Sequence, residues 1–182
     1  SLRLQTEISP AQDIHRQLVP PIEFVTPHFE FFGRSVPSTE VGGDLLDVVE
    51  RDGGYTVVVA DVSGHGMRAG VVMAMLKSAI RTRILAAKGL DSLFDDLHNV
   101  VHKLAGRGMF VTSVCVNLGK SSTKYANAGH IPILHCVARD GRVRRLSERS
   151  LPFGVVGMEK RPKGKSYTWR AFNYRPGDLL VL

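Results

Sequence analysis

The sequence predicts an α+β domain in which two long helices separate two blocks of strands. Its 182 residues suit one domain with a sizeable apolar core. Apolar side chains recur at helical spacing over residues 67–87 and 91–104. Short β-branched and apolar runs stand before and after this helical region. Because strands and helices occupy separate blocks, we expect antiparallel sheets with helices packed against them.

The first block of strands follows a short helix over residues 9–18, which Pro20-Pro21 ends. Residues 45–50 and 55–62 flank Arg51-Asp52-Gly53-Gly54, a strong turn signal, and therefore predict a hairpin. The nearly continuous apolar run of the second strand indicates burial on both faces. Further strands are expected over residues 29–36, 109–117, 123–128, 133–138, 143–146, 166–172 and 179–182.

Composition excludes several classes of protein. No apolar run approaches the roughly 20 residues of a membrane helix, so we expect no membrane segment. Cys115 and Cys136 are isolated in apolar surroundings and predict buried free thiols in a reducing, cytoplasmic compartment. The net charge of +7 arises in residues 139–182, which hold 11 Lys/Arg and four Asp/Glu. Since this segment lacks interleaved aromatic residues, we interpret it as a solvated surface and expect no nucleic-acid partner.

Two aspartates stand at adjacent ends of the predicted hairpin, each beside glycines. Asp44 follows Gly42-Gly43, and Asp61 comes shortly before Gly64. Singly, each is more simply a turn or helix cap. Together, they place two carboxylates side by side, and such a pair repels unless a proton or a cation intervenes. Carboxylate oxygens are the ligands that Mg²⁺ and Mn²⁺ prefer, so the pair predicts a metal site that can activate a water molecule.

These aspartates belong to a series of six spaced motifs. In order, the motifs are Gly42-Gly43-Asp44, Ala60-Asp61-Val62-Ser63-Gly64-His65-Gly66, Phe110-Val111-Thr112, Asn127-Ala128-Gly129-His130, Pro152-Phe153-Gly154 and Pro176-Gly177-Asp178. In this order they resemble the bacterial PP2C-like phosphatases of the RsbU and SpoIIE type. The resemblance runs from about residue 14 to the last residue, and the number of motifs makes it far more specific than any single one.

The resemblance implies a protein serine/threonine phosphatase with an α-β-β-α sandwich of two antiparallel sheets flanked by helices. It implies two Mn²⁺ or Mg²⁺ ions, with Asp44, Asp61 and the carbonyl of Val62 as ligands. The implied substrate is a phosphorylated anti-sigma-factor antagonist of the STAS type. Dephosphorylation frees this antagonist to sequester an anti-sigma kinase, which releases a sigma factor. A homodimer is a further partner to consider.

The resemblance also suggests how the chain is divided. Residues 1–20 are expected to be a switch helix from an upstream sensor domain, and residues 21–182 a phosphatase domain whose C-terminal portion is missing. The family continues past the strand at 179–182 into further acidic metal ligands, so we expect this chain to hold at most half of them. The alternative function is therefore a catalytically impaired pseudophosphatase that acts as a binding or dimerisation module.

Further candidates lie around the aspartates. His65 could donate a proton to a leaving seryl oxygen, or could simply hold the geometry of its loop. Ser63 could donate a hydrogen bond to a phosphate or to a metal-bound water, and with Gly64 it is an expected substrate-binding position. Ser63 lacks the Gly-x-Ser-x-Gly context of a nucleophile. Arg34, on a predicted strand, could bind the phosphate bidentately, although a surface arginine is the commoner case.

Four other polar residues are given structural roles. Asn127 and His130 flank a small-residue turn, and we favour turn chemistry over support of the site. His98 and His102 are spaced by one helical turn, but the His-Glu-x-x-His pattern is absent and no third ligand is apparent. We expect both to be surface or helix-packing histidines.

Overall fold

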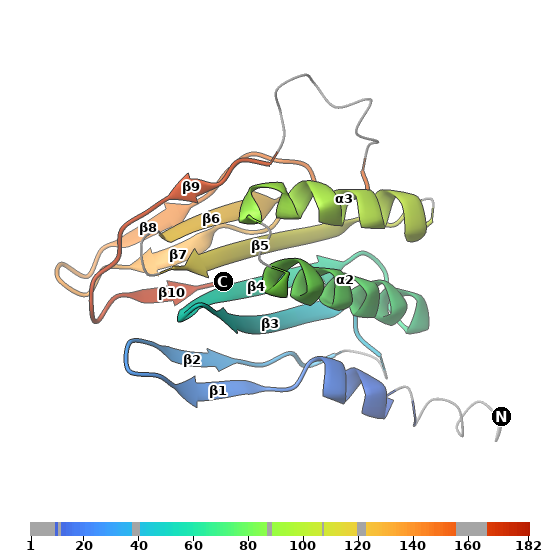
Figure 1. Ribbon diagram of the computed structural model, residues 1–182, viewed down its shortest axis with the longest axis horizontal. Coiled ribbons are helices and arrows are strands. Elements are labelled where there is room, and N and C mark those ends of the chain that lie inside the picture. Colours follow the sequence, from blue (N-terminus) through green and yellow to red (C-terminus); the bar gives the residue numbers. More distant parts are fainter. Residues whose placement is uncertain are drawn as a thin grey trace.

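A five-stranded antiparallel sheet forms the centre of the molecule in the computed structural model (Figure 1). The structure describes residues 10, 12–37, 41–86, 89–106, 108–119, 123–155 and 167–182. The strands of the central sheet, in spatial order, are β3 (Asp44–Arg51), β4 (Gly54–Val62), β5 (Val111–Leu118), β6 (Thr123–Ala128) and β9 (Arg170–Ala171).

The β3–β4 pair is the predicted hairpin. Asp52 and Gly53 form its two-residue turn, and both have positive φ, at 54° and 72°. This backbone twist matches that of the flanking strands. The turn therefore fixes the register in which Arg51 pairs with Gly54 and, at the far end, Asp44 pairs with Asp61.

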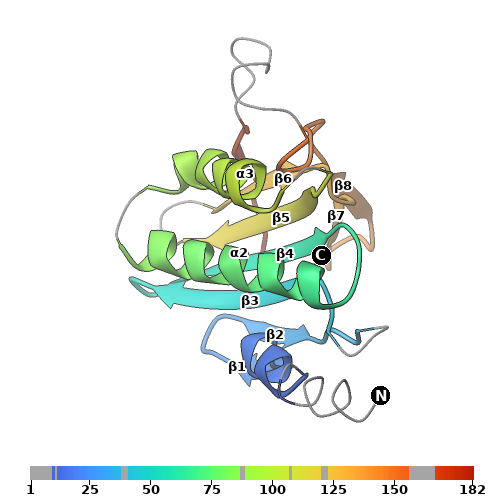
Figure 2. The same cartoon turned by 90° about the vertical axis from the view of Figure 1, so that its right-hand side faces the viewer.

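Helices cover one face of the central sheet (Figure 2). They are α2 (Met67–Leu85) and α3 (Leu93–Leu104), the latter preceded by the short 3-10 helix η1 (Leu90–Ser92). Both long helices were predicted, and their buried faces meet alternate residues of the strands. The core between them includes Leu45, Val58, Val62, Met73, Leu76, Ile80, Phe94, Leu97, Val111 and Cys115. None of the helices among the described residues is long and apolar enough to cross a membrane.

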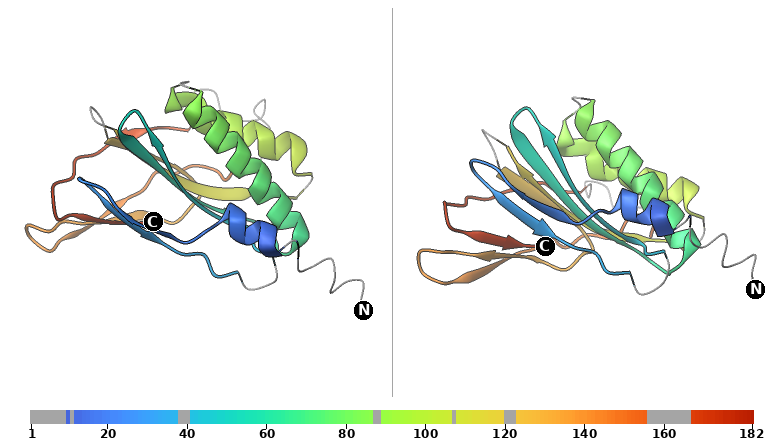
Figure 3. Two further views of the ribbon diagram at one scale, coloured as in Figure 1. Left: turned by 60° about the horizontal axis from the view of Figure 1, so that its bottom comes forward. Right: turned by 90° about the horizontal axis from the view of Figure 1, so that it is seen from below.

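The opposite face of the central sheet carries a second layer of strands (Figure 3). One part is the hairpin β1 (Ile22–Val25) and β2 (Glu30–Gly33). The other is a three-stranded sheet in the order β10 (Leu179–Val181), β7 (Ile133–Cys136), β8 (Val143–Leu146). A second apolar cluster joins the layers, and it includes Phe31, Val114, Val116, Tyr125, Ile133, Leu146 and Leu180. Helices, central sheet and second strand layer supply the α-β-β part of the α-β-β-α sandwich that the family resemblance implies.

Some predicted elements differ from those observed. The strand Ile22–Val25 was not predicted, because Pro20-Pro21 signals only the end of a helix. The strand expected over residues 29–36 ends at Gly33, so Arg34 lies just beyond it. The strand expected at 166–172 is reduced to Arg170–Ala171. Residues 12–18 are helical as expected, whereas Ser9 and the other residues before Pro10 lie outside the described residues.

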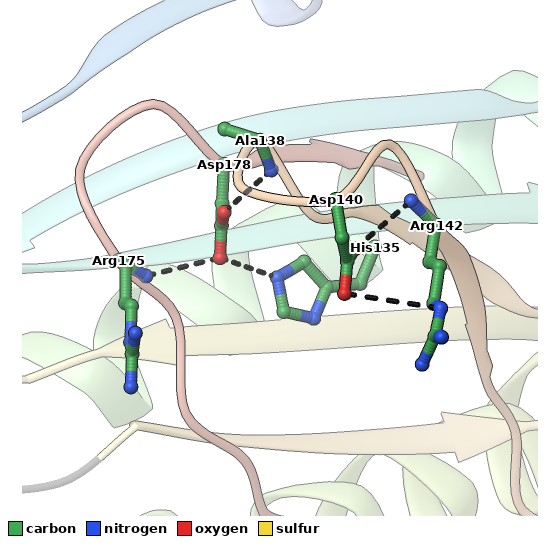
Figure 4. Close-up of polar contacts among 6 residues, drawn as sticks. All are labelled: His135, Ala138, Asp140, Arg142, Arg175 and Asp178. Atoms are coloured by element: carbon green, nitrogen blue, oxygen red, sulfur yellow. Dashed lines mark hydrogen bonds and ion pairs between the residues drawn. The ribbon is translucent and has the colours of Figure 1, made fainter.

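The motif Pro176-Gly177-Asp178 forms a turn that ties β10 to β7 (Figure 4). One carboxylate oxygen of Asp178 is 2.8 Å from Nε2 of His135 and accepts the backbone N–H of Arg175 at 3.0 Å. The other oxygen accepts the backbone N–H of Ala138 at 2.9 Å. These hydrogen bonds, that of Ala138 first, lower the pKa of Asp178 to about 2.

Candidate active site

Asp44 and Asp61 lie side by side on the face of the central sheet that is turned away from the helices. They are direct partners in the register of β3 and β4, and Asp61 is in turn the partner of Thr112 on β5. Their neighbours Leu45 and Val62 are buried against the helices. Because successive side chains of a strand point to opposite faces, Asp44, Asp61 and Thr112 form one row on the other face.

The electrostatics of this row favour a bound cation. Burial, and then the charge of Asp44, raise the pKa of Asp61, while His130 acts in the opposite direction. The hydroxyl of Ser35 donates to Asp44 at 3.5 Å, which is a weak contact. The burial that raises the pKa of Asp61 covers only part of this side chain, and both aspartates are exposed as residues, so a cation can reach the carboxylates. The two side chains therefore fit one part of a divalent-metal shell. No group of three or more His, Cys, Asp and Glu placed for a metal ion occurs within the described ranges.

Gly43 lets the chain come close to the end of β4. A Cβ atom at this position would lie 2.9 Å from the carbonyl oxygen of Val62 and 3.1 Å from the side chains of Val62 and Ala69. Only a glycine avoids this overlap. The glycine before Asp44 thus places the β3 backbone beside the carbonyl that the sequence predicts as a metal ligand.

The loop after Asp61 is held by Ser63. Its backbone N–H donates to the carbonyl of Phe110 at 2.9 Å, and its hydroxyl accepts the N–H of Phe110 at 3.0 Å. Gly64 and Gly66 have φ of 89° and 74°, so the loop needs glycine at both positions. It presents His65 to solvent before α2 begins at Met67. Ser63 therefore shapes the loop, and its own proton is still available to an acceptor.

Arg34 lies near the row without being part of a strand. It is exposed and comes directly after β2, and the next residue, Ser35, contacts Asp44. The expectation that Arg34 sits on a strand is wrong because the pairing with β1 ends at Gly33. Its exposed side chain is nevertheless attached to backbone beside the aspartates.

For His130 the sequence favoured a turn role over support of the site, whereas the structure places its ring beside the row of Asp44, Asp61 and Thr112. Its Nδ1 is 2.8 Å from the hydroxyl of Thr112, so it adjoins the row. Burial lowers the pKa of His130, and the charges of Asp61 and Asp44 act against this shift. The turn interpretation is confirmed for Asn127, whose amide accepts the N–H of His130 at 2.9 Å and donates to its carbonyl at 3.0 Å. The Asn-x-x-His motif at a strand end was the available signal.

The histidines of α3 have the packing role that the sequence predicts. His98 is fully buried, and its Nδ1 is 3.1 Å from the hydroxyl of Tyr167. His102 is exposed, with its ring stacked on that of His98 at 6.0 Å between centroids. Both belong to the helix layer, on the other side of the central sheet from Asp44 and Asp61.

Comparison with known proteins places the chain in a family. The sequence model of the family described as Stage II sporulation protein E (SpoIIE) matches residues 51–182. The chain belongs to the SpoIIE family. Among curated relatives, phosphoserine phosphatase RsbU of Bacillus subtilis (strain 168) is 26% identical over 152 residues, which are 81% of this chain and 43% of RsbU. The chain thus spans less than half the length of this relative.

Solved structures show the same fold. The SiaA-PP2C domain of Pseudomonas aeruginosa aligns with 98% of this chain and 70% of that domain, with a TM-score of 0.71 and 18% identity. RsbX in complex with magnesium aligns with 87% of this chain and 74% of that one, with a TM-score of 0.61 and 16% identity. The SpoIIE-family chain therefore has the PP2C-type phosphatase fold predicted from its motifs.

Proposed function

We propose that this chain is part of a metal-dependent protein serine/threonine phosphatase. The observation that carries the proposal is the direct pairing of Asp44 with Asp61 on two hydrogen-bonded strands. The reaction is the attack of water on the phosphorus of a phosphoserine, with cleavage of the bond to the seryl oxygen and release of inorganic phosphate. A bound Mn²⁺ or Mg²⁺ supplies charge neutralisation and a water molecule of lowered pKa.

The chain's own residues divide the remaining tasks. Asp44, Asp61 and the carbonyl of Val62 hold the metal ions, of which the complete domain would bind two. The Ser63 hydroxyl, the Gly64 backbone N–H and the Arg34 guanidinium bind the phosphate, because these donors lie on segments beside the aspartates. His65, at the exposed tip of the loop, donates the proton that the leaving seryl oxygen takes up.

The comparisons with known proteins support the proposed type of reaction, which is metal-dependent hydrolysis of a phosphoserine. RsbU is a phosphoserine phosphatase, and RsbX binds magnesium in its crystal structure. We further propose that the whole protein acts in the cytoplasm on a phosphorylated STAS-type anti-sigma-factor antagonist. In this proposal an upstream sensor domain regulates the phosphatase through the helix that ends before Pro20. The phosphatase that responds to this domain is a homodimer.

The test is an assay with Mn²⁺ or Mg²⁺ and a phosphoserine protein, run on the full-length protein and on this chain. Asp44→Asn and Asp61→Asn should each lower turnover by at least about 100-fold, since each removes a charged ligand that bears on the transition state. Asp52→Asn, at the opposite end of the same hairpin, is the matched control and should leave turnover unchanged. Turnover that survives both substitutions in the row, or that needs no metal, contradicts the proposal.

A further inference from the structure

His130 is a titratable residue beside the two aspartates to which the proposed reaction assigns no task. It follows β6 and adjoins Thr112 on the neighbouring strand β5. Thr112 is the register partner of Asp61, at the usual spacing of about 5 Å between adjacent strands. The row on this face of the sheet therefore continues from Asp44 through Asp61 and Thr112 to the imidazole of His130.

The backbone of His130 is held by a set of hydrogen bonds that a simple surface turn does not need. The buried amide of Asn127 bonds to both the N–H and the carbonyl of His130, and also to the carbonyl of Ile131 at 3.3 Å. Ser150 spans the same turn by donating to the carbonyl of Asn127 and accepting the N–H of Gly129. The ring is thus presented from a rigid support, which is the condition for a useful contact with a reacting group.

The contact with Thr112 also selects one form of the ring. Among the described residues, Nδ1 of His130 is the one hydrogen-bond partner of the Thr112 hydroxyl. If the hydroxyl donates its proton there, Nδ1 is the acceptor and the ring proton of the neutral imidazole resides on Nε2. Burial lowers the pKa of His130, which favours this neutral form near pH 7. Nε2 then carries an N–H for which the hydrogen bonds of the described residues provide no acceptor.

We propose that His130 is a further substrate-contacting residue, whose Nε2–H donates a hydrogen bond to a phosphoryl oxygen, and that Thr112 is its positioning residue. A neutral donor next to a metal-held phosphate stabilises charge on the phosphoryl oxygens without competing for the cations. This inference rests on the proposed function, in which the phosphate lies beside Asp44 and Asp61.

The first test is a binding measurement that does not depend on turnover. Long-range ¹H–¹⁵N spectra of the imidazoles would be recorded on this chain with Mg²⁺ while inorganic phosphate is added, and His130→Gln assigns the signal. The expected result is a neutral ring protonated on Nε2, whose Nε2 signal moves with phosphate. In Thr112→Val, the tautomers should mix and the phosphate shift should weaken. A ring protonated on Nδ1, or a signal that phosphate leaves in place, overturns the inference.

The second test separates a contact from a structural role by kinetics on the full-length protein. Removing one preorganised donor costs roughly 100-fold in kcat, so His130→Leu should show this loss with little change in KM. His130→Gln keeps an N–H donor and should recover part of the loss, and Thr112→Val should lose about 10-fold. His102→Leu, an exposed histidine on α3, is the matched control. A His130→Leu enzyme with unchanged kcat overturns the inference.

The two tests also distinguish failure of the inference from failure of the proposed function. A wild-type protein that turns over no phosphoserine substrate but shows the phosphate-dependent shift of His130 contradicts the proposed reaction and supports the phosphate contact. A wild-type protein that is active, with neither the shift nor the kinetic effect, supports the reaction and overturns the role of His130.

Discussion

Asp44 and Asp47 lie three positions apart on β3, and this odd spacing puts them on opposite faces of the sheet. Asp47 is buried and faces α2, where the guanidinium of Arg81 donates to both of its oxygens at 2.7 and 2.8 Å. Lys77 is 3.3 Å away. The hydrogen bond with Asp47 raises the pKa of Arg81. One acidic residue of the motif region thus fixes a helix, while the other lies in the candidate site.

Asp47→Ala should therefore destabilise the fold without touching the candidate metal ligands. It would leave the charge of Lys77 in a nearly buried position, and removing one partner of a fully buried pair costs about 3–5 kcal/mol. Because Arg81 is half exposed and can be rehydrated, we expect about 2 kcal/mol, measured by urea unfolding. Asp52→Asn is the control, since the exposed pair of Asp52 with Arg51 contributes less than about 1 kcal/mol. Equal effects of the two substitutions would contradict this account of Asp47.

Gly43→Ala tests the close approach of the two strands at the site. The added methyl group would overlap the carbonyl oxygen of Val62, and the backbone of β3 would have to move away from β4. We expect at least a 10-fold loss of Mg²⁺ affinity by calorimetry, since a shift of a few tenths of an ångström disturbs a metal shell.

Gly89→Ala is the matched control for this substitution. Gly89 has φ of −54° and open space where a Cβ would stand. The change should leave metal affinity unaltered and raise stability slightly. If Gly43→Ala also leaves metal affinity unaltered, Val62 is not a ligand.

At the scale of elements, the sequence predicted the features that local signals determine, such as the position of a turn and the register of its hairpin. The Asp52-Gly53 turn fixes the register of the hairpin, so the proximity of Asp44 and Asp61 follows from counting residues along two strands. The proximity of His130 does not follow, because it depends on β6 pairing with β5 and on where that pairing stops. Strand β1 was missed for the same reason, since its four residues are a strand only through their pairing with β2.

The turn before β10 should give the fold a defined sensitivity to acid. The pKa of Asp178 is about 2 in the folded protein, below its ordinary value of 3.8. A lowered carboxyl pKa stabilises the fold above the unfolded value, and this contribution is lost as the pH falls from about 4 towards 2. At pH 5 the unfolding free energies of wild type and Asp178→Asn should thus differ by the full contribution of the ionised carboxylate. The difference should shrink below pH 4, and a difference that persists to pH 2 would falsify the assignment.

For the whole molecule, the two strand layers differ in how they are held. The central strands β4 and β5 pair along their whole length and are covered on both faces. The β1–β2 hairpin has two strands, and a hairpin of this size is marginally stable alone. It is attached to Tyr55 of β4 through aromatic rings, with centroid distances of 5.1 Å from Phe31, 5.8 Å from Phe29 and 6.4 Å from Phe24. Local opening should therefore be much easier at the hairpin than at the centre.

Amide hydrogen exchange on wild type and Phe31→Ala tests this difference in stability. In the wild type, amides of residues 113–116 should exchange most slowly, through global unfolding, and those of residues 22–33 should exchange fastest among the strands. Phe31→Ala removes the ring of the hairpin segment that lies nearest to Tyr55, so exchange in 22–33 should accelerate by at least about 10-fold. Exchange at residues 113–116 occurs through global unfolding, so its rate should change only as much as the change in the global free energy of unfolding requires. If both segments accelerate equally at matched stability, the hairpin unfolds with the central sheet, and the second strand layer is part of the same cooperative unit as Asp44 and Asp61.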